Sequence, residues 1–359
     1  MNVMIITGEF GNGHVSAARA LEQKLKNADA ENEVVVIDIV RHLFPRASAA
    51  VYGVFDSVAS HCSGIYNMMN RVDEHQLHMP MKRWFIEKFR ELIDTFEPDL
   101  MISTWPVGAR YIGAFKDCTG CDIPYITCIT DITAHSEWLS ASSDAYFVGD
   151  ISIKGELARK GIDPEKIYVS GIPVRSEFSS PREVSGAGPA KVKNILIMGG
   201  GLGLIPGADE LLDILTRDEN TRVTVITGKN EKLKRRLGER FPSADVRGYV
   251  DSPAECMKRA DWIITKAGGI TTFEAIMSET PMLILPPFLE QESENAEYIV
   301  RRGLGVVLSE SRSDWSSEIP GLLADDSAAG EITGNMRGIK REIERNDIQG
   351  VMERLGRTA

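Results

Sequence analysis

The sequence predicts an α/β fold of two doubly wound, Rossmann-like domains that face each other across a cleft. Three observations lead to this prediction. The chain has 359 residues, which suggests two domains at about 150 residues per domain. Short β-rich runs alternate with helical patterns, as they do in proteins with a parallel sheet. Each half of the chain also opens with a strand that leads into a glycine-rich loop, at residues 8–14 and 199–203.

The first elements follow from the apolar pattern near the N-terminus. Val3–Thr7 is a short β-rich run, and Ala17–Lys26 places alanine and leucine at helical spacing. Glu33–Asp38 is typical of a buried strand. The same alternation predicts four further strands in this half of the chain: Leu100–Ser103, Tyr125–Thr130, Ala145–Val148 and Lys166–Val169.

A run of small residues with proline and glycine, 179–190, predicts the linker between the domains. The pattern then starts again, and the strands predicted after the linker are Asn194–Met198, Arg222–Thr227, Trp262–Thr265, Met282–Leu285 and Val306–Leu308. We therefore expect one domain over 1–178 and a second over 191–330. The charged tail, 331–359, has a helical tendency, and we expect it to pack back across the domains.

The composition excludes several classes of protein. A hydrophobic fraction of 43% argues against a disordered chain. The formal net charge of −11 argues against a nucleic-acid partner, because such binding depends on neutralising phosphates. No basic region precedes the N-terminal apolar run, and no run of about 18 apolar residues occurs, so we expect neither a signal peptide nor a membrane-spanning helix. We expect a cytoplasmic protein.

The chain has five cysteines, which a reducing cytoplasm would keep as thiols. Cys118 and Cys121 have the spacing of a zinc or redox pair, but the sequence contains no second such pair. A chance pair in a loop is the favoured interpretation, and we expect no bound metal.

Three glycine-rich loops are candidate phosphate sites: 8–14, 199–203 and 268–272. Ligands of doubly wound sheets bind at the carboxyl ends of the strands, where such loops lie. Glycine lets backbone amides approach a phosphate closely, and the dipole of a following helix favours its negative charge. The loops therefore indicate a nucleotide or another phosphate-bearing ligand.

A dinucleotide site is one alternative for these loops. Gly11 and Gly13, with Asp38 at the end of the next strand, partly match the NAD-binding fingerprint. Ser16 stands at the third position of that fingerprint, and in the second loop Pro206 stands where glycine or alanine is required. These mismatches argue against NAD.

The most specific pattern is Thr265–Ala275 followed by Pro286–Ala296. A strand there ends in a Gly-Gly turn, and Thr271 and Thr272 are candidates to cap the next helix. Glu274, one turn into that helix, is suited to accept hydrogen bonds from two ribose hydroxyls. Taken alone, the pattern would also fit a capped surface helix followed by a polar loop.

Several motifs, in matching order, resemble those of one glycosyltransferase family. Over residues 1 to about 310, the chain is similar to the family of monogalactosyldiacylglycerol synthases, processive diacylglycerol glucosyltransferases and the peptidoglycan N-acetylglucosaminyltransferase. Besides the pattern above, the segments that carry the resemblance are Gly11–Ala18, Thr130–Trp138 and Gly171–Arg175.

The resemblance implies a GT-B fold and an inverting, metal-independent transfer of a hexose from a UDP-sugar, without a cofactor. It implies that residues 1–178 bind the acceptor, diacylglycerol or a related lipid, and that residues 191–330 bind the UDP-sugar. The residues that it places around the UDP-sugar are Gly13, Gly199, Gly200, Gly201, Gly203, Tyr249, Val250, Gly268, Gly269, Ile270, Thr271, Thr272, Glu274, Glu290, Gln291 and Asn295.

Within this set the resemblance implies separate roles. The loops 199–203 and 268–272 would hold the diphosphate, with helix dipoles and amides in place of a metal ion. Backbone near Tyr249 and Val250 would bind uracil, and Glu274 would hold the ribose. The hexose would be held by polar side chains of the later segment, Gln291 with Asn295 or Glu290.

Inversion by direct displacement needs one general base for the acceptor hydroxyl. His14 is the predicted base, because it lies where a glycine loop enters a helix whose dipole lowers the imidazole pKa. The alternative is that His14 only orders the loop. Asp131 is a rival base, or a partner that orients a histidine. His135 and Trp138 are predicted walls of the acceptor site.

Residues 51–90 are rich in aromatic residues and methionine, and Met79–Arg90 carries four basic residues against one glutamate, a net charge of +3. We expect Trp84 and Phe85 to contact the lipid acceptor. The segment would then bind an anionic membrane surface at the inner face of the cell membrane. The alternative is a helix pair packed on the sheet, with its basic side chains merely solvated.

The chain departs from the family at Ala267, where proline is common, and at Leu289 and Glu290, where the family usually has Pro-Gly. A carboxylate at Glu290 alters the predicted sugar pocket, so glucose, galactose and an N-acetylhexosamine all remain candidates. Other classes also stay open. They are an isomerase like UDP-N-acetylglucosamine 2-epimerase, a non-catalytic nucleotide-sugar sensor and a glycosyltransferase with a non-lipid acceptor.

Overall fold

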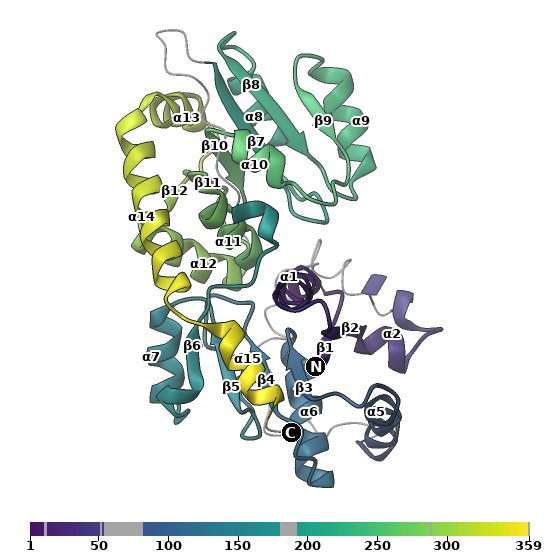
Figure 1. The fold of residues 1–359 in the computed structure, drawn as a ribbon. Helices are drawn as coiled ribbons and strands as arrows, with labels where there is room; N and C mark the ends of the chain where they lie inside the picture. Colours follow the sequence, from purple (N-terminus) through teal and green to yellow (C-terminus); the bar gives the residue numbers. More distant parts are fainter. Residues whose placement is uncertain (11–12, 51, 54–81, 180–191, 288, 358–359) are drawn as a thin grey trace. The chain divides into compact units, whose positions relative to one another are not determined.

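The computed structural model describes residues 1–10, 13–50, 52–53, 82–179, 192–287 and 289–357. The chain divides into two compact units, of which the first comprises Met1–Arg175 with Glu342–Ala359 and the second Ser176–Arg341. Each unit is built on one six-stranded sheet, flanked by helices (Figure 1). Neighbouring strands in both sheets pair in parallel. The predicted α/β fold with two doubly wound sheets is confirmed.

The sheet of the first unit has the strand order β2-β1-β3-β4-β5-β6. Its elements are β1 (Asn2–Thr7), α1 (Gly13–Ala28), β2 (Glu33–Asp38), α2 (Ile39–Leu43), α5 (Lys82–Phe96), β3 (Leu100–Ser103), α6 (Pro106–Thr119), β4 (Tyr125–Cys128), η2 (Ser136–Trp138), β5 (Ala145–Val148), α7 (Ile151–Arg159), η3 (Pro164–Lys166), β6 (Ile167–Val169) and α15 (Ile348–Gly356). Because β1 pairs with both β2 and β3, sheet growth reverses direction between β1 and β3. Ligands of doubly wound sheets bind at such switch points.

The sheet of the second unit has the order β12-β11-β10-β7-β8-β9. Its elements are η4 (Ser176–Ser179), β7 (Lys193–Met198), α8 (Ala208–Leu215), β8 (Thr221–Ile226), α9 (Glu231–Arg240), β9 (Asp245–Arg247), α10 (Ala254–Arg259), β10 (Trp262–Thr265), α11 (Gly269–Ser278), β11 (Met282–Ile284), α12 (Glu290–Arg301), β12 (Gly305–Val307), α13 (Trp315–Ala324) and α14 (Asp326–Glu344). Here the switch point lies between β7 and β10, which are neighbours in the sheet.

The division of the chain differs in detail from the predicted one. The boundary between the units falls at Arg175 and Ser176, and all of the predicted linker except Ser179 lies outside the described residues. In the tail, most of α14 belongs to the second unit and α15 to the first. Strand β9 was not predicted, because its three residues include two exposed charged side chains and so lack an apolar run.

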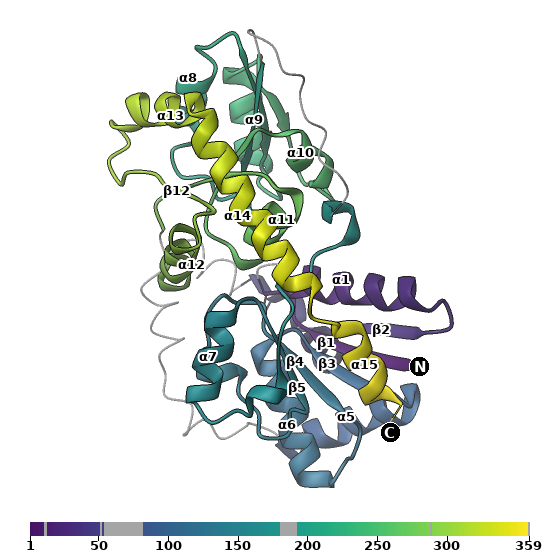
Figure 2. The same ribbon diagram turned by 60° about the vertical axis from the view of Figure 1, so that its left-hand side comes forward.

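The two faces of the first sheet are buried by different helices. Val3 and Ile5 of β1 pack in one apolar cluster with side chains of α1 and α15. Met4 and Ile6 point to the other face and pack with α5 and α6. Figure 2 shows α15 running alongside this sheet. Burial on both faces explains why β1 has a continuous apolar sequence rather than an alternating one.

Helix α5 buries aromatic side chains that were expected to contact lipid. Phe85 and Phe89 are 1% and 0% exposed, and their ring centroids lie 5.4 Å apart in the core. The prediction that Phe85 contacts the acceptor is therefore wrong, because this face of α5 packs on the sheet. Trp84 is partly buried, 5.4 Å between centroids from Phe44. Over the described residues, no helix combines the length and apolar character needed to cross a bilayer.

Candidate functional site

His14 lies in the first turn of α1, which follows β1 at the switch point of the first sheet. Its Nδ1 is 2.7 Å from Oγ1 of Thr130, just beyond β4. The hydroxyl of Thr104, just beyond β3, donates a hydrogen bond of 2.9 Å to the carbonyl oxygen of His14. Residues that follow two neighbouring strands therefore hold both the ring and the backbone of this histidine.

Desolvation lowers the pKa of the His14 imidazole from its ordinary value of 6.5. The nearby Asp131 carboxylate and a hydrogen bond between the ring and the backbone of Thr104 raise it again, but by less. This direction of the pKa shift is the predicted one, and burial is its largest cause. A lowered pKa keeps the imidazole neutral at pH 7, so a ring nitrogen can accept a proton.

Asp131 is held in place by a buried tryptophan. The carboxylate is 6% exposed and accepts a hydrogen bond of 2.9 Å from Nε1 of Trp138. Trp138 is 0% exposed, and its ring lies edge-on to His14 with 6.1 Å between centroids. This burial contradicts the prediction that Trp138 lines the acceptor site; it orients Asp131 instead. His135, partly exposed directly before η2, stays a predicted acceptor contact.

The glycine loop after β7 is tightly built. Gly200 and Gly203 have φ values of 67° and 66°, which favour glycine. A side chain at Gly203 would overlap the carbonyl oxygen of Thr227. The amides of Gly203 and Leu204 donate to the carbonyl oxygens of Gly200 and Gly199 at 3.0 Å. The glycines are therefore required for this turn to close on itself and to pack against Thr227. Gly201 also belongs to this turn.

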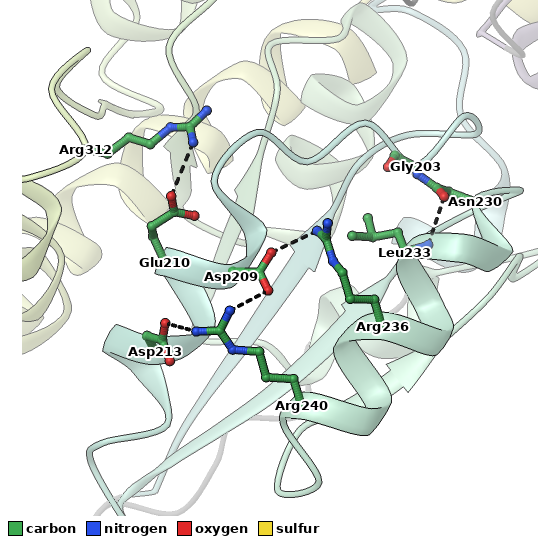
Figure 3. A network of polar contacts seen from close by, with 9 residues as sticks. All are labelled: Gly203, Asp209, Glu210, Asp213, Asn230, Leu233, Arg236, Arg240 and Arg312. Atoms are coloured by element: carbon green, nitrogen blue, oxygen red, sulfur yellow. Dashed lines mark hydrogen bonds and ion pairs between the residues drawn. The ribbon is translucent and has the colours of Figure 1, made fainter.

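Asn230 attaches this glycine loop to α9. Its Oδ1 accepts a hydrogen bond of 3.0 Å from the amide of Leu233, and its Nδ2 donates to the carbonyl oxygen of Gly203 at 3.4 Å. Figure 3 shows that ion pairs also join α8 to α9, among them Asp209 with Arg236 at 2.8 Å. These contacts fix the loop relative to the two helices around it.

The Gly-Gly turn after β10 leads directly into α11. Gly268 is the N-cap residue, and the Thr272 hydroxyl donates to its carbonyl oxygen at 2.8 Å. The prediction that Thr271 or Thr272 caps this helix is wrong, because Thr272 bonds back within the first turn and no side chain caps the helix. Gly269 and Ile270 are the first two residues of α11. Backbone amides at the start of an α-helix have no acceptor within the helix.

Polar side chains that were predicted to bind the sugar lie in α11 and α12. Glu274 is 7% exposed within α11, and Asn295 is 2% exposed within α12. Nδ2 of Asn295 donates to the carbonyl oxygen of Ala267 at 2.9 Å, and its Oδ1 has no hydrogen-bond partner among the described residues. Glu290 and Gln291 begin α12, with Glu290 exposed and Gln291 partly buried.

Apart from Gly13, the residues predicted to bind the UDP-sugar lie along the carboxyl-end edge of the second sheet. Tyr249 and Val250 follow β9, and Tyr249 is 57% exposed. The other predicted residues follow β7, β10 and β11, so all lie beyond the carboxyl ends of parallel strands. Gly13, His14 and Asp131 belong to the first unit. The part of the chain that the structure describes has no group of three or more His, Cys, Asp or Glu residues able to hold a metal ion.

Thr130 and Lys266 are residues of the site that were not predicted from the sequence. Thr130, which contacts the ring of His14, directly precedes Asp131 at the end of an apolar strand. Lys266, which forms an ion pair with Glu292, directly follows another. A polar residue right after a buried strand was the signal available in both cases. Their partners lie far away in the sequence, so the contacts themselves could not be predicted.

The family models and the sequence relatives agree on the kind of enzyme. The family model described as monogalactosyldiacylglycerol (MGDG) synthase matches residues 14–174, and the glycosyltransferase family 28 C-terminal domain matches residues 194–325. A processive diacylglycerol beta-glucosyltransferase of Bacillus cereus (strain AH187) is 30% identical over 352 residues, covering 94% of this chain and 90% of the relative. The enzyme of the same name from Bacillus subtilis (strain 168) is 28% identical over 357 residues, covering 94% and 91%.

Solved structures share the fold at low sequence identity. The glycosyltransferase of kitacinnamycin superposes with a TM-score of 0.68 at 13% identity, covering 98% of both chains. MurG of Acinetobacter baumannii gives 0.60 at 16%, covering 95% of this chain and 98% of that one. A UDP-N-acetylglucosamine 2-epimerase gives 0.57 at 15%, covering 96% and 95%. Because transferases and an isomerase share this architecture, the fold alone does not separate them.

Proposed function

We propose a function for this chain, which belongs to the family of monogalactosyldiacylglycerol synthases and processive diacylglycerol β-glucosyltransferases and is a UDP-sugar-dependent glycosyltransferase with a GT-B fold. It transfers a hexose from the UDP-sugar to a hydroxyl of diacylglycerol or a related lipid, with inversion and without a metal ion. Glucose is the first donor sugar to test, because the relatives are named glucosyltransferases. The observation that carries the proposal is the partly buried His14 ring, held by Thr130 and within electrostatic reach of the Asp131 carboxylate.

His14 acts as the general base in this proposal. Its neutral imidazole takes the proton of the acceptor hydroxyl while the hydroxyl oxygen forms a bond to the anomeric carbon of the sugar. The bond from that carbon to the β-phosphate oxygen breaks, and its electron pair leaves with UDP. The Asp131 carboxylate stabilises the imidazolium that forms, as a carboxylate does beside a catalytic histidine. Thr130 and Trp138 keep these two groups oriented.

The second unit supplies the donor site in this proposal. Amides of the loop 199–203 and of the first turn of α11 stabilise the diphosphate, where the positive end of the helix dipole lies. Glu274 holds the ribose, and Tyr249 with Val250 lies against the uracil. The hexose binds near Asn295, whose buried Oδ1 has no partner in the described part of the chain. A sugar hydroxyl that donates to this atom would satisfy it. The neighbouring residues proposed for the hexose are Gln291 and Glu290.

An acceptor-dependence assay tests the proposed function. We expect the chain to release UDP from UDP-glucose when diacylglycerol is present in mixed micelles, and to release very little without it. Conversion of a UDP-sugar to an isomer without any acceptor would instead identify an isomerase. Binding of UDP with no turnover on any lipid or sugar acceptor would identify a sensor. UDP release that depends on a water-soluble acceptor, but not on lipid, would contradict the lipid assignment.

We also propose that α5 binds an anionic membrane surface. Its exposed side carries Arg83 and Arg90, opposite the buried Phe85 and Phe89. Arg83 is 95% exposed, and its pairing with Glu87 at 3.3 Å is open to solvent and therefore weak. Each basic residue near such a surface contributes about 1 kcal/mol of binding. The first residues of the predicted membrane segment, Met79–Met81, lie outside the described residues.

Vesicle co-sedimentation measures this association. We expect the chain to sediment with phosphatidylglycerol vesicles at low salt and to remain in the supernatant with phosphatidylcholine vesicles. Arg83→Glu with Arg90→Glu should weaken binding at least about tenfold, since two attractions of about 1 kcal/mol each become repulsions. As a control, reversing the charge of the exposed Arg222 and Arg235 of the second unit should weaken vesicle binding less. No binding of the unaltered chain at low salt would contradict the membrane proposal.

A further inference from the structure

Lys266 connects three parts of the second unit's switch point. It directly follows β10 and belongs to the loop that leads into α11. Its Nζ forms an ion pair of 2.8 Å with Oε1 of Glu292 on α12. Its side chain also lies close to the glycine loop after β7. A β-carbon added to Gly200 would be 3.7 Å from Cε of Lys266. The ammonium therefore lies where the two glycine loops and α12 come together.

The backbone around this lysine is held firmly. The amide of Gly268 donates to the carbonyl oxygen of Lys266 at 2.8 Å. Asn295 donates through Nδ2 to the next carbonyl oxygen, that of Ala267, at 2.9 Å. The same side chain is 2% exposed, and its Oδ1 has no hydrogen-bond partner among the described residues. A buried polar atom of this kind costs free energy until a polar ligand or water satisfies it.

The two members of the ion pair differ in their access to solvent. The Lys266 side chain is 31% exposed, whereas that of Glu292 is 11% exposed. A ligand can therefore reach the ammonium while the carboxylate stays behind it. Glu292 gives the ammonium one anionic partner in the structure, and a bound phosphate would give it another.

We propose that Lys266 binds the diphosphate of the donor nucleotide, and that Glu292 holds its ammonium group in position. The inference rests on the proposed function, which makes the ligand a UDP-sugar. As the bond to the anomeric carbon breaks, negative charge grows on the β-phosphate oxygens. The Lys266 ammonium then stabilises the leaving group together with the backbone amides of the glycine loops. In metal-dependent enzymes a divalent cation supplies the positive charge that faces the diphosphate. Here the Lys266 side chain supplies part of that charge.

Calorimetric titration with UDP and with uridine tests this inference, because only UDP carries the diphosphate. Lys266→Met should weaken UDP binding by at least about tenfold, the effect of losing one charge-assisted hydrogen bond. Uridine binding should stay within about twofold of the unaltered chain, since uridine offers the ammonium no anion. Lys266→Arg keeps the charge and should retain most of the affinity for UDP.

Lys340 offers a matched control. It forms an ion pair of 2.8 Å with Glu279, which lies just beyond the C-terminal end of α11, and it belongs to the same unit. Lys340→Met removes the same charge and the same kind of contact, and it should leave both titrations unchanged. Circular dichroism and thermal unfolding of the two methionine variants show whether either has lost the fold.

A second variant keeps the inference testable even if Lys266→Met does not fold. Glu292→Gln keeps a side-chain oxygen that can hold the ammonium in position but removes the negative charge that competes with the diphosphate, so UDP should bind more tightly by a few fold, and uridine as before. Weaker UDP binding in Glu292→Gln would overturn the inference. Equal losses for UDP and uridine in Lys266→Met would do the same, as would a UDP loss no larger than in Lys340→Met. An unaltered chain that binds neither ligand contradicts the proposed function itself.

Discussion

Replacing His14 by alanine is expected to lower kcat by at least about a hundredfold, the usual contribution of a general base. The affinity for UDP should stay near that of the unaltered chain, because the residues proposed to hold the diphosphate, ribose and uracil belong to the second unit. Initial rates with UDP-glucose and diacylglycerol give kcat, and titration with UDP gives the affinity. A variant that turns over at the unaltered rate would remove His14 from the mechanism and favour the alternative that it only orders its loop.

His42 is a suitable control for this experiment. It is an exposed histidine of the same unit, in α2, and no proposed step uses it. His42→Ala should leave both kcat and the affinity for UDP unchanged. Thr130→Val tests the contact that holds the His14 ring, since it removes the hydroxyl that lies 2.7 Å from Nδ1 and keeps the side-chain shape. Its effect should be smaller than that of His14→Ala.

Asp131→Asn should lower kcat by about ten- to a thousandfold, because the imidazolium formed during transfer loses its counter-charge. The asparagine keeps an oxygen for the Trp138 hydrogen bond, so the packing can persist.

The Asp131→Asn variant should also change the pH profile of kcat/KM. The reaction requires neutral His14, and burial lowers the pKa of that group from 6.5, so activity of the unaltered chain should persist below pH 6.5 and fall at lower pH.

In Asp131→Asn, the direction in which the acid limb of kcat/KM moves follows from the charge that is removed. Asp131 raises the pKa of His14. Removing its charge lowers that pKa further, so the acid limb of kcat/KM should move to lower pH. An acid limb that stays in place would show that Asp131 does not act on His14. If Asp131→Asn abolished turnover while His14→Ala retained it, Asp131 would be the base.

The fold could be predicted because its signals are local. Apolar strands such as that of Val3–Thr7, each followed by a loop and a helical pattern, were sufficient to predict two doubly wound sheets. The misassignment of Phe85 has an equally physical origin. Phe85, Phe89 and Leu92 lie four and three residues apart, which places them on one face of a helix, and all are buried. That spacing indicates a core face, whereas aromatic content and net charge alone suggested a membrane contact.

The site could be predicted only where a local pattern carries it. The glycine loops and His14 can be recognised in the sequence, and the described residues of each loop follow a strand at the switch point of its own sheet. The contacts that orient the site are not local. Thr130 meets His14 from 116 residues away, and Lys266 meets Glu292 from 26. Which side chains meet at such distances depends on strand order, so they appear only once the sheet is known.

The anomeric configuration of the product tests the central claim most directly. UDP-glucose carries its sugar in the α configuration, and a single displacement by the acceptor oxygen inverts that centre. The chain is incubated with UDP-glucose and diacylglycerol, and the coupling constant of the anomeric proton in the glycolipid is read by NMR. We predict a β-linked glucosyl lipid. An α-linked product would contradict direct displacement with His14 as the base.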